Sequence, residues 1–213
     1  LDDPRPARRA DAGPGRGGHE VNPAYLKQAW LVLILALVFG AALAGVQSAW
    51  GPKIQQNKDD EMMGAVPELV PGAVRGVPVD ASGQPTDVAS AFALKAVDAQ
   101  GKRVGWVVKG VGDGYADRIE LLVALDPPAE RILGIEVLAQ NETPGLGNKI
   151  KEPSFRERFA GRPTDMTLEA TPRPEKANEI QAVSQATISS QSVCRIVNRT
   201  VRDAREALAG TSE

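Results

Sequence analysis

The stretch SQATISSQSVCRIVNRTVRDAREALA, residues 184–209, decides the fold of this chain. From Ser190 to Ala209 its apolar residues recur at helical spacing, and Gly210 follows as a stop signal. The apolar stripe consists of Val193, Ile196, Val197, Val201, Ala204 and Leu208. Cys194 borders this stripe, so we expect a buried structural thiol. A helix with one apolar face must pack that face on another element.

The segments before this helix indicate a sheet. Four β-rich runs occur at 91–97, 103–109, 119–125 and 131–139. The third run, IELLVAL, is almost entirely apolar, which suits a strand buried on both faces. Glycine- or proline-rich segments at 110–114 and 126–128 are expected turns, 153–158 begins a short helix, and 171–175 is a loop. Strands followed by a packing helix predict an α+β domain with an antiparallel or mixed sheet.

An apolar segment near the beginning predicts a membrane anchor. Residues 29–50 read AWLVLILALVFGAALAGVQSAW and contain no charged residue. A helix of this length crosses a hydrocarbon core of about 30 Å, and Trp30 and Trp50 lie where indole rings favour the interface. A cleaved signal peptide or a buried core helix are the alternatives. The run is longer than a signal h-region, and no small-residue cleavage site precedes Gly51. We therefore expect a transmembrane helix over 25–50.

The charges beside this span predict its orientation. Five basic residues precede it and two follow it closely, which places the N-terminus in the cytoplasm and the following domain outside. The predicted order is a disordered cytoplasmic tail (1–24), the span, a stalk (51–72) and an extracytoplasmic domain (73–213). The stalk has a possible packing face formed by Met62, Met63, Val66, Leu69 and Val70. This organisation describes a single-pass protein of the inner (cytoplasmic) membrane.

Composition excludes several classes of function. The chain has 213 residues and a net charge of −2, so it offers no basic field for nucleic acid. One cysteine cannot form an internal disulfide, and one histidine, His19, gives no Cys/His cluster for zinc, haem or an iron–sulfur centre. The outer domain contains no histidine, so a Ser-His-Asp triad cannot form there.

Two segments carry residues suited to a bound group. Residues 184–190 place Thr187 just before the last helix, where a helix N-terminus holds a phosphate, although such a Ser/Thr-rich lead is commonly only a cap. Residues 141–147 read NETPGLG, in which two glycines around Leu146 let the backbone approach a flat ligand. Glu142 and Thr143 add hydrogen-bonding groups. The alternative for this second segment is a tight loop after a strand.

These segments together resemble a known family. Residues 134–137, 142–150 (ETPGLGNKI) and 182–190 (AVSQATISS) resemble the FMN-binding domain of the Rnf complex G subunit, which is related to the C subunit of the sodium-pumping NADH:quinone reductase. Gly105-Trp106, 110–115 and 119–122 resemble the preceding strands of that family. The resemblance covers about 25–209 and includes the single membrane helix before the domain.

The resemblance implies a flavin site. In that family the last threonine of an Asp-x-x-Ser/Thr-Gly-Ala-Thr pattern carries FMN through a phosphodiester, and the matching residue here is Thr187. Ser184 and Ala186 match the pattern, whereas Gln181 replaces its aspartate and Gln185 its glycine. The expected cofactor-binding residues are Thr187, Ser184, Ala186 and Ser189 around the phosphate, and Glu142, Thr143, Gly145, Leu146 and Gly147 along the isoalloxazine ring.

The resemblance also implies a function. It is that of an electron-transfer subunit in a membrane oxidoreductase or translocase complex, whose partners are other membrane subunits and the lipid bilayer. It implies no soluble substrate besides the flavin. Because Gln181 and Gln185 depart from the pattern, non-covalent FMN and loss of the flavin are alternatives. Two rival functions follow: an assembly subunit with a degenerate flavin site, and a solitary membrane-anchored binding or sensor domain.

Overall fold

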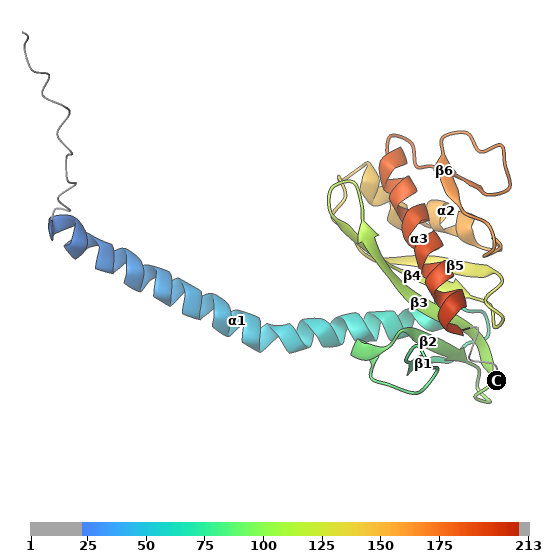
Figure 1. The fold of residues 1–213 in the computed structure, drawn as a ribbon, viewed down its shortest axis with the longest axis horizontal. Coiled ribbons are helices and arrows are strands. Elements are labelled where there is room, and N and C mark those ends of the chain that lie inside the picture. The colour runs from blue at the N-terminus through green and yellow to red at the C-terminus, as the bar shows by residue number, and fades with distance from the viewer. Residues whose placement is uncertain (1–22, 209–213) are drawn as a thin grey trace, which may run out of the picture. The chain divides into compact units, whose positions relative to one another are not determined.

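The computed structural model describes residues 23–208 of the chain (Figure 1). Nearly all of the predicted tail, and the predicted stop at Gly210, lie outside these residues. The chain divides into two compact units, Leu1–Pro52 and Lys53–Glu213.

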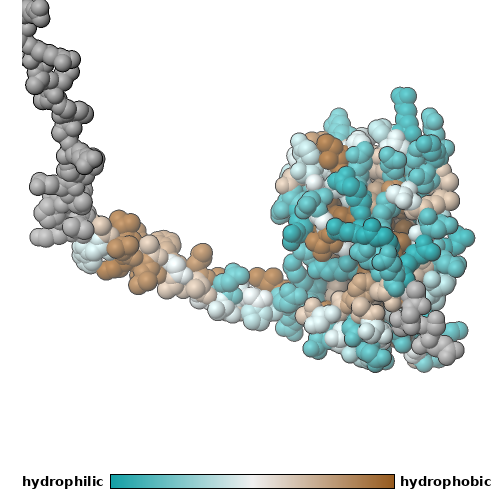
Figure 2. All heavy atoms as spheres, viewed as in Figure 1, coloured by the Kyte–Doolittle hydropathy of each residue, from teal (hydrophilic) through white to brown (hydrophobic). Residues whose placement is uncertain are grey.

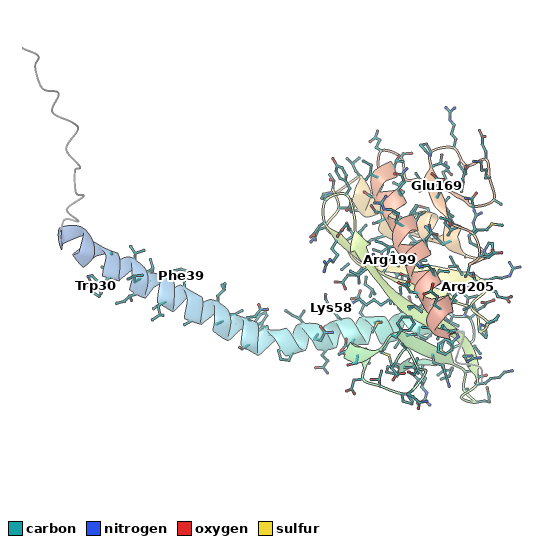
Figure 3. All side chains as sticks on the ribbon, viewed as in Figure 1. Trp30, Phe39, Lys58, Glu169, Arg199 and Arg205 are labelled. Carbon is teal, nitrogen blue, oxygen red and sulfur yellow. The ribbon has the colours of Figure 1, made fainter. Side chains whose placement is uncertain are left out.

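The first unit contains the apolar part of helix α1, which runs over Pro23–Leu69. Its most apolar 18-residue window has a mean hydropathy of 2.6, and none of that window is buried in protein. Trp30 and Phe39 are 55% and 66% exposed, and hydrophobic residues follow one another along this part of the helix (Figures 2 and 3). Side chains of this kind are stable in lipid rather than in water, so α1 is long and apolar enough to anchor the chain in a membrane.

The second unit is built on an antiparallel sheet whose strands are neighbours in chain order. Its strands are β1 (Arg75–Val79), β2 (Ala93–Val97), β3 (Arg103–Asp113), β4 (Arg118–Leu125) and β5 (Ile132–Ala139). Strands β6 (Glu169–Thr171) and β7 (Glu179–Gln181) form a small parallel pair, and α3 covers Thr187–Leu208. Short helices are η1 (Val88–Ser90), η2 (Gly147–Lys151), α2 (Pro153–Arg156) and η3 (Glu157–Phe159). The predicted α+β class is confirmed.

Strand β4 shows how both faces of the sheet are covered. Its odd-numbered residues from Ile119 to Leu125 join the core beneath α3, together with Val193 and Val197. Leu122 and Ala124 point to the other face, in a second core that contains Met62, Val66 and Val70. Burying one such side chain is worth about 1.5–3 kcal/mol. The predictions of a strand buried on both faces and of a packing face on residues 62–70 are both confirmed.

The predicted turn at 110–114 was wrong. Strand β3 continues through Asp113, and Gly110 and Gly112 pair with Leu121 and Ile119 of β4. A Cβ atom on Gly110 would lie 2.3 Å from the Thr200 hydroxyl of α3. These glycines therefore allow the helix to approach the sheet closely, rather than to turn the chain. The turn comes later, where the Gly114 amide donates to the Asp117 carbonyl at 2.8 Å.

The prediction that Cys194 is a buried structural thiol is confirmed. The side chain is 2% exposed in the core beneath α3, and burial raises the pKa of its thiol to about 12. The thiol stays protonated at physiological pH, which removes the nucleophilic thiolate.

Candidate functional site

The lead into α3 is fixed by its own hydrogen bonds. The Ala186 amide donates to the Val183 carbonyl at 3.0 Å, and α3 begins at Thr187 rather than at the predicted Ser190. The Ser190 hydroxyl accepts from the Val183 amide at 3.0 Å and donates to the Ala186 carbonyl at 2.9 Å. Ser190 is fully buried, so it closes the turn and holds the residue before the helix in place.

Gln185 occupies a strained position in this turn. Its φ of +64° lies in the left-handed region, which costs a residue with a side chain about 1–2 kcal/mol. The side chain itself is exposed to solvent. This is the position at which the resemblance places glycine, the residue that adopts such a φ freely.

Glu142 joins the loop after β5 to two other segments. Its side chain is 4% exposed. Oε1 accepts from the backbone amides of Tyr115 and Ala116 at 2.8 and 3.1 Å. Oε2 accepts from the Ser189 hydroxyl in the first turn of α3 at 2.5 Å. One carboxyl group therefore ties the β3–β4 turn, the predicted ligand loop and the start of α3 together.

Two glycines make room for this carboxyl group. A Cβ atom on Gly114 would lie 2.2 Å from Glu142 Oε1. A Cβ atom on Gly147 would lie 2.7 Å from the Ser189 hydroxyl and 2.8 Å from Glu142 Oε2. The space beside Gly147 is therefore filled by the side chains of Ser189 and Glu142. Gly145 differs, because it has a φ of +78° and open space around it.

Thr187 lies at the positive end of a 22-residue helix. Its side chain is partly exposed. In the part of the chain that the structure describes, the amides of Thr187, Ile188 and Ser189 have no hydrogen-bond acceptor, whereas the Ser190 amide donates to the Ala186 carbonyl at 3.0 Å. Unpaired first-turn amides beside a hydroxyl group form a suitable place for an anion.

The structure brings some of the predicted residues together and leaves others apart. Glu142, Gly147 and Ser189 are in contact. Ala186 is buried directly before Thr187. The remaining predicted residues are exposed to solvent: Thr143, Gly145, Leu146 and Ser184. Ser189 was expected to face the phosphate, but its hydroxyl donates to Glu142 instead.

Tyr115 has a role that the sequence patterns do not indicate, because its backbone amide binds Glu142. The side chain of Tyr115 is 65% exposed, and Leu146 and Ile188 are 37% and 52% exposed. These three large apolar side chains come from the three segments that Glu142 joins. These three residues could have been identified from the sequence, because each lies within a segment that carries the family resemblance.

Gln181 lies on β7 with its side chain exposed. Its carbonyl oxygen accepts a hydrogen bond from the guanidinium group of Arg158. The position that corresponds to the family's aspartate is therefore open to solvent and near a cationic side chain.

A groove of about 1130 Å³ lies elsewhere on the domain. It follows α3 from Arg195 to Leu208 and is bordered by residues 163–168. None of the nine predicted residues lines it. The candidate flavin site and this groove are different places at the two ends of one helix.

The fold and the site define the class of the protein. Residues 114–202, which include Glu142 and Thr187, match the FMN-binding domain family. The crystal structure of the C subunit of the Na(+)-translocating NADH-quinone reductase from Parabacteroides distasonis has a similar fold. Its TM-score is 0.54 at 20% identity, over 66% of this chain and 79% of that one.

The sequence defines the family more narrowly. The chain is 30% identical over 167 residues to the G subunit of the ion-translocating oxidoreductase complex of Methanosarcina acetivorans, which covers 76% of this chain and 85% of the relative. It is also 30% identical over 196 residues to the G subunit of the same type of complex from Pseudomonas aeruginosa, covering 83% and 87%. The chain belongs to the family of G subunits of ion-translocating oxidoreductase complexes, as its resemblance to the Rnf G subunit predicted.

Proposed function

We propose that this chain is a membrane-anchored flavoprotein subunit that carries electrons through an FMN esterified to Thr187, within an ion-translocating oxidoreductase complex. The observation that carries the proposal is the 2.5 Å hydrogen bond from Ser189 to Glu142. It holds the 142–147 loop against the first turn of α3, beside Thr187. The two sequence segments suited to a flavin thus meet at a helix N-terminus.

The residues present fit an FMN phosphate. The unpaired amides of Thr187, Ile188 and Ser189 supply hydrogen-bond donors, and the dipole of α3 stabilises negative charge there by about 0.3–1 kcal/mol per charge. When bound, FMN supplies the redox chemistry, while the protein supplies position and electrostatics. The exposed side chains of Tyr115, Leu146 and Ile188 offer apolar surface for the ring beside the phosphate.

Covalent attachment assigns a specific role to Thr187. A bond forms between Thr187 Oγ1 and the phosphorus of the flavin, the hydroxyl proton is lost, and a leaving group departs from the phosphorus of an activated flavin donor. The family resemblance implies that a separate flavin transferase forms this ester, so the chain would have to present the hydroxyl to another protein. The partial exposure of Thr187 and the exposed side chain of Gln181 support such access.

Intact mass spectrometry of the full chain, expressed with its own flavin transferase, tests the attachment. We expect one FMN adduct in the native protein and none in Thr187→Ala. Thr187→Ser keeps a hydroxyl and should keep part of the adduct. Ser82→Ala is the matched control, because Ser82 is an exposed hydroxyl residue outside the predicted flavin-binding segments. A native mass without an adduct would reject the ester, and flavin released on denaturation would then indicate non-covalent binding.

The proposed topology places residues 1–24 in the cytoplasm and the domain outside. The basic residues before the span support this orientation. Protease added to the cytoplasmic face of sealed vesicles should remove only residues before about Tyr25. Digestion of residues 77–213 from that face would contradict the proposed orientation.

A second function, that of an assembly subunit with a degenerate flavin site, is favoured by two departures from the family pattern. Gln185 holds a left-handed backbone conformation that a glycine adopts without cost, and Gln181 lacks the family's carboxyl group. If the native motif is only partly competent, Gln181→Asp with Gln185→Gly should raise flavin occupancy in the intact mass. If neither the native nor the restored chain acquires flavin, the assembly function is the better one.

A further inference from the structure

The exposed face of α3 carries a row of arginines beyond the flavin site. From residue 195 onward, the exposed residues of α3 are Arg195, Arg199, Arg202, Arg205 and Glu206. The four arginines, here called the arginine ridge, follow one another at helical intervals of four, three and three residues. At 1.5 Å per residue the ridge is about 15 Å long. Arg199 and Arg205 extend from α3 in Figure 3, and strongly hydrophilic residues gather over this helix in Figure 2.

The ridge borders the 1130 Å³ groove, whose lining is both apolar and cationic. Apolar side chains include Trp106, Ile132, Leu168 and Val201, and Met166 is 44% exposed at its border. Five arginines line the groove against three acidic residues. The chain as a whole has a net charge of −2, so this positive surface opposes the overall charge.

Internal contacts use only part of the donor capacity of the ridge. Arg195 donates to the Ser192 hydroxyl at 2.7 Å, Arg205 donates to the Thr164 carbonyl at 3.3 Å, and Arg199 donates to the Val111 carbonyl. Among the described residues, the acidic partner of the ridge is Asp203, 3.0 Å from Arg202 and its direct neighbour in sequence. A guanidinium group has five N–H donors, so most of them remain available.

We propose that the arginine ridge and its groove bind an acidic segment of a neighbouring subunit of the complex. The charges are spread along a line rather than converging on one point, which suits an extended acidic chain better than a compact anion. Arginine pairs with carboxylates through two parallel hydrogen bonds, a geometry that lysine cannot match. The apolar floor would take side chains between the acidic residues. The proposal rests on the proposed function only in taking its partner from the redox complex.

Photo-crosslinking in the native membrane tests this surface. The full chain with Met166→p-benzoylphenylalanine is expressed in its complex and irradiated, and the crosslinked peptides are identified by mass spectrometry. We expect a crosslink to another subunit of the complex, within a segment rich in Asp and Glu. A crosslink to lipid, to a second copy of this chain or to a segment without acidic residues would overturn the proposal, as would no crosslink.

Charge reversal provides the second measurement. Arg202→Glu should lower retention of the chain in the detergent-solubilised complex by on the order of tenfold at low salt, and added salt should shrink the difference. Arg173→Glu is the matched control, since Arg173 is exposed and lies outside the groove. Equal loss in both variants, or no loss in either, rejects a specific site. Flavin measured in the same samples separates this result from the proposed function, because docking does not require flavin on Thr187.

Discussion

The two ends of α3 differ in the burial of their polar side chains. At its beginning, Ser189 and Ser190 are almost completely buried, and each hydroxyl group has a partner. Toward its end, the exposed positions are occupied mainly by arginines whose hydrogen bonds use backbone carbonyls or nearby side chains. The first arrangement fixes geometry, and the second leaves charge available to solvent.

The difference shows where the sequence tolerates change. A buried hydrogen bond is strong because little water competes for it, and an unpaired group left behind costs about 1–3 kcal/mol. An exposed ion pair is worth about 0.2–1 kcal/mol, because water and salt screen it. Substitutions at the beginning of α3 should therefore change stability and flavin binding together. Substitutions on the arginine ridge should change association alone.

The largest effect is expected at Glu142. Glu142→Ala leaves two backbone amides and the Ser189 hydroxyl without their acceptor, so the free energy of unfolding should fall by about 3 kcal/mol. Glu142→Gln keeps a carbonyl oxygen for the amides, and it should cost only about 1 kcal/mol. Chemical unfolding of the detergent-solubilised chain measures both. Equal stability of the native chain and Glu142→Ala would show that these hydrogen bonds do not hold the segments together.

A smaller loss is expected at Gly147. Gly147→Ala places a methyl group within 3 Å of Glu142 and Ser189, and such overpacking costs about 1–3 kcal/mol. Gly134→Ala is the control, because its Cβ atom would meet only Leu69, at 3.4 Å. The same unfolding measurement applies. If both variants lose equal stability, the close packing at Gly147 is not specific to the Glu142 contact.

Much of the fold could be predicted from patterns in the sequence. Runs of β-branched and aliphatic residues identified four strands of the sheet, and the stripe from Val193 to Leu208 identified α3. Strand β1 was missed because Pro78 interrupts it, and proline is tolerated there since β1 is an edge strand. The prediction of a turn at Gly110 was wrong because Thr200, the residue that requires a glycine there, is far away in the sequence.

The candidate site was predictable in its location but not in its internal contacts. Thr187 could be placed at a helix start because the helix has a clear apolar period. The hydrogen-bond partners of Glu142 could not be predicted, because Tyr115 is 27 residues away and binds through its backbone amide, which leaves no signal in the sequence. The arginine ridge had a visible pattern at positions 195, 199, 202 and 205, yet its groove depends on residues from separate loops.

A gain of stability is expected at Gln185. Gln185→Gly relieves the left-handed φ of +64°, although glycine also raises the entropy of the unfolded chain. The net effect should be an increase of about 0.5–1 kcal/mol in the free energy of unfolding. The same change at Gln191, inside α3, should lower stability by about 1 kcal/mol. A loss at both positions would mean that the Gln185 side chain contributes more than its backbone conformation costs.

The smallest effect on stability is expected at Arg202. This residue also tests most directly whether the two ends of α3 have separate roles. Its side chain is 65% exposed and pairs only with the adjacent Asp203 among the described residues, so Arg202→Glu should change the free energy of unfolding by less than about 0.5 kcal/mol. Because Thr187 and its amides lie at the other end of α3, the flavin adduct should also be unchanged. Unfolding, intact mass and retention in the complex are measured on one preparation. Lost retention with unchanged stability and flavin would separate the two ends of the helix into a fixed site and a docking surface. A comparable loss of stability would show that the ridge supports the fold, and the division between the two ends would not hold.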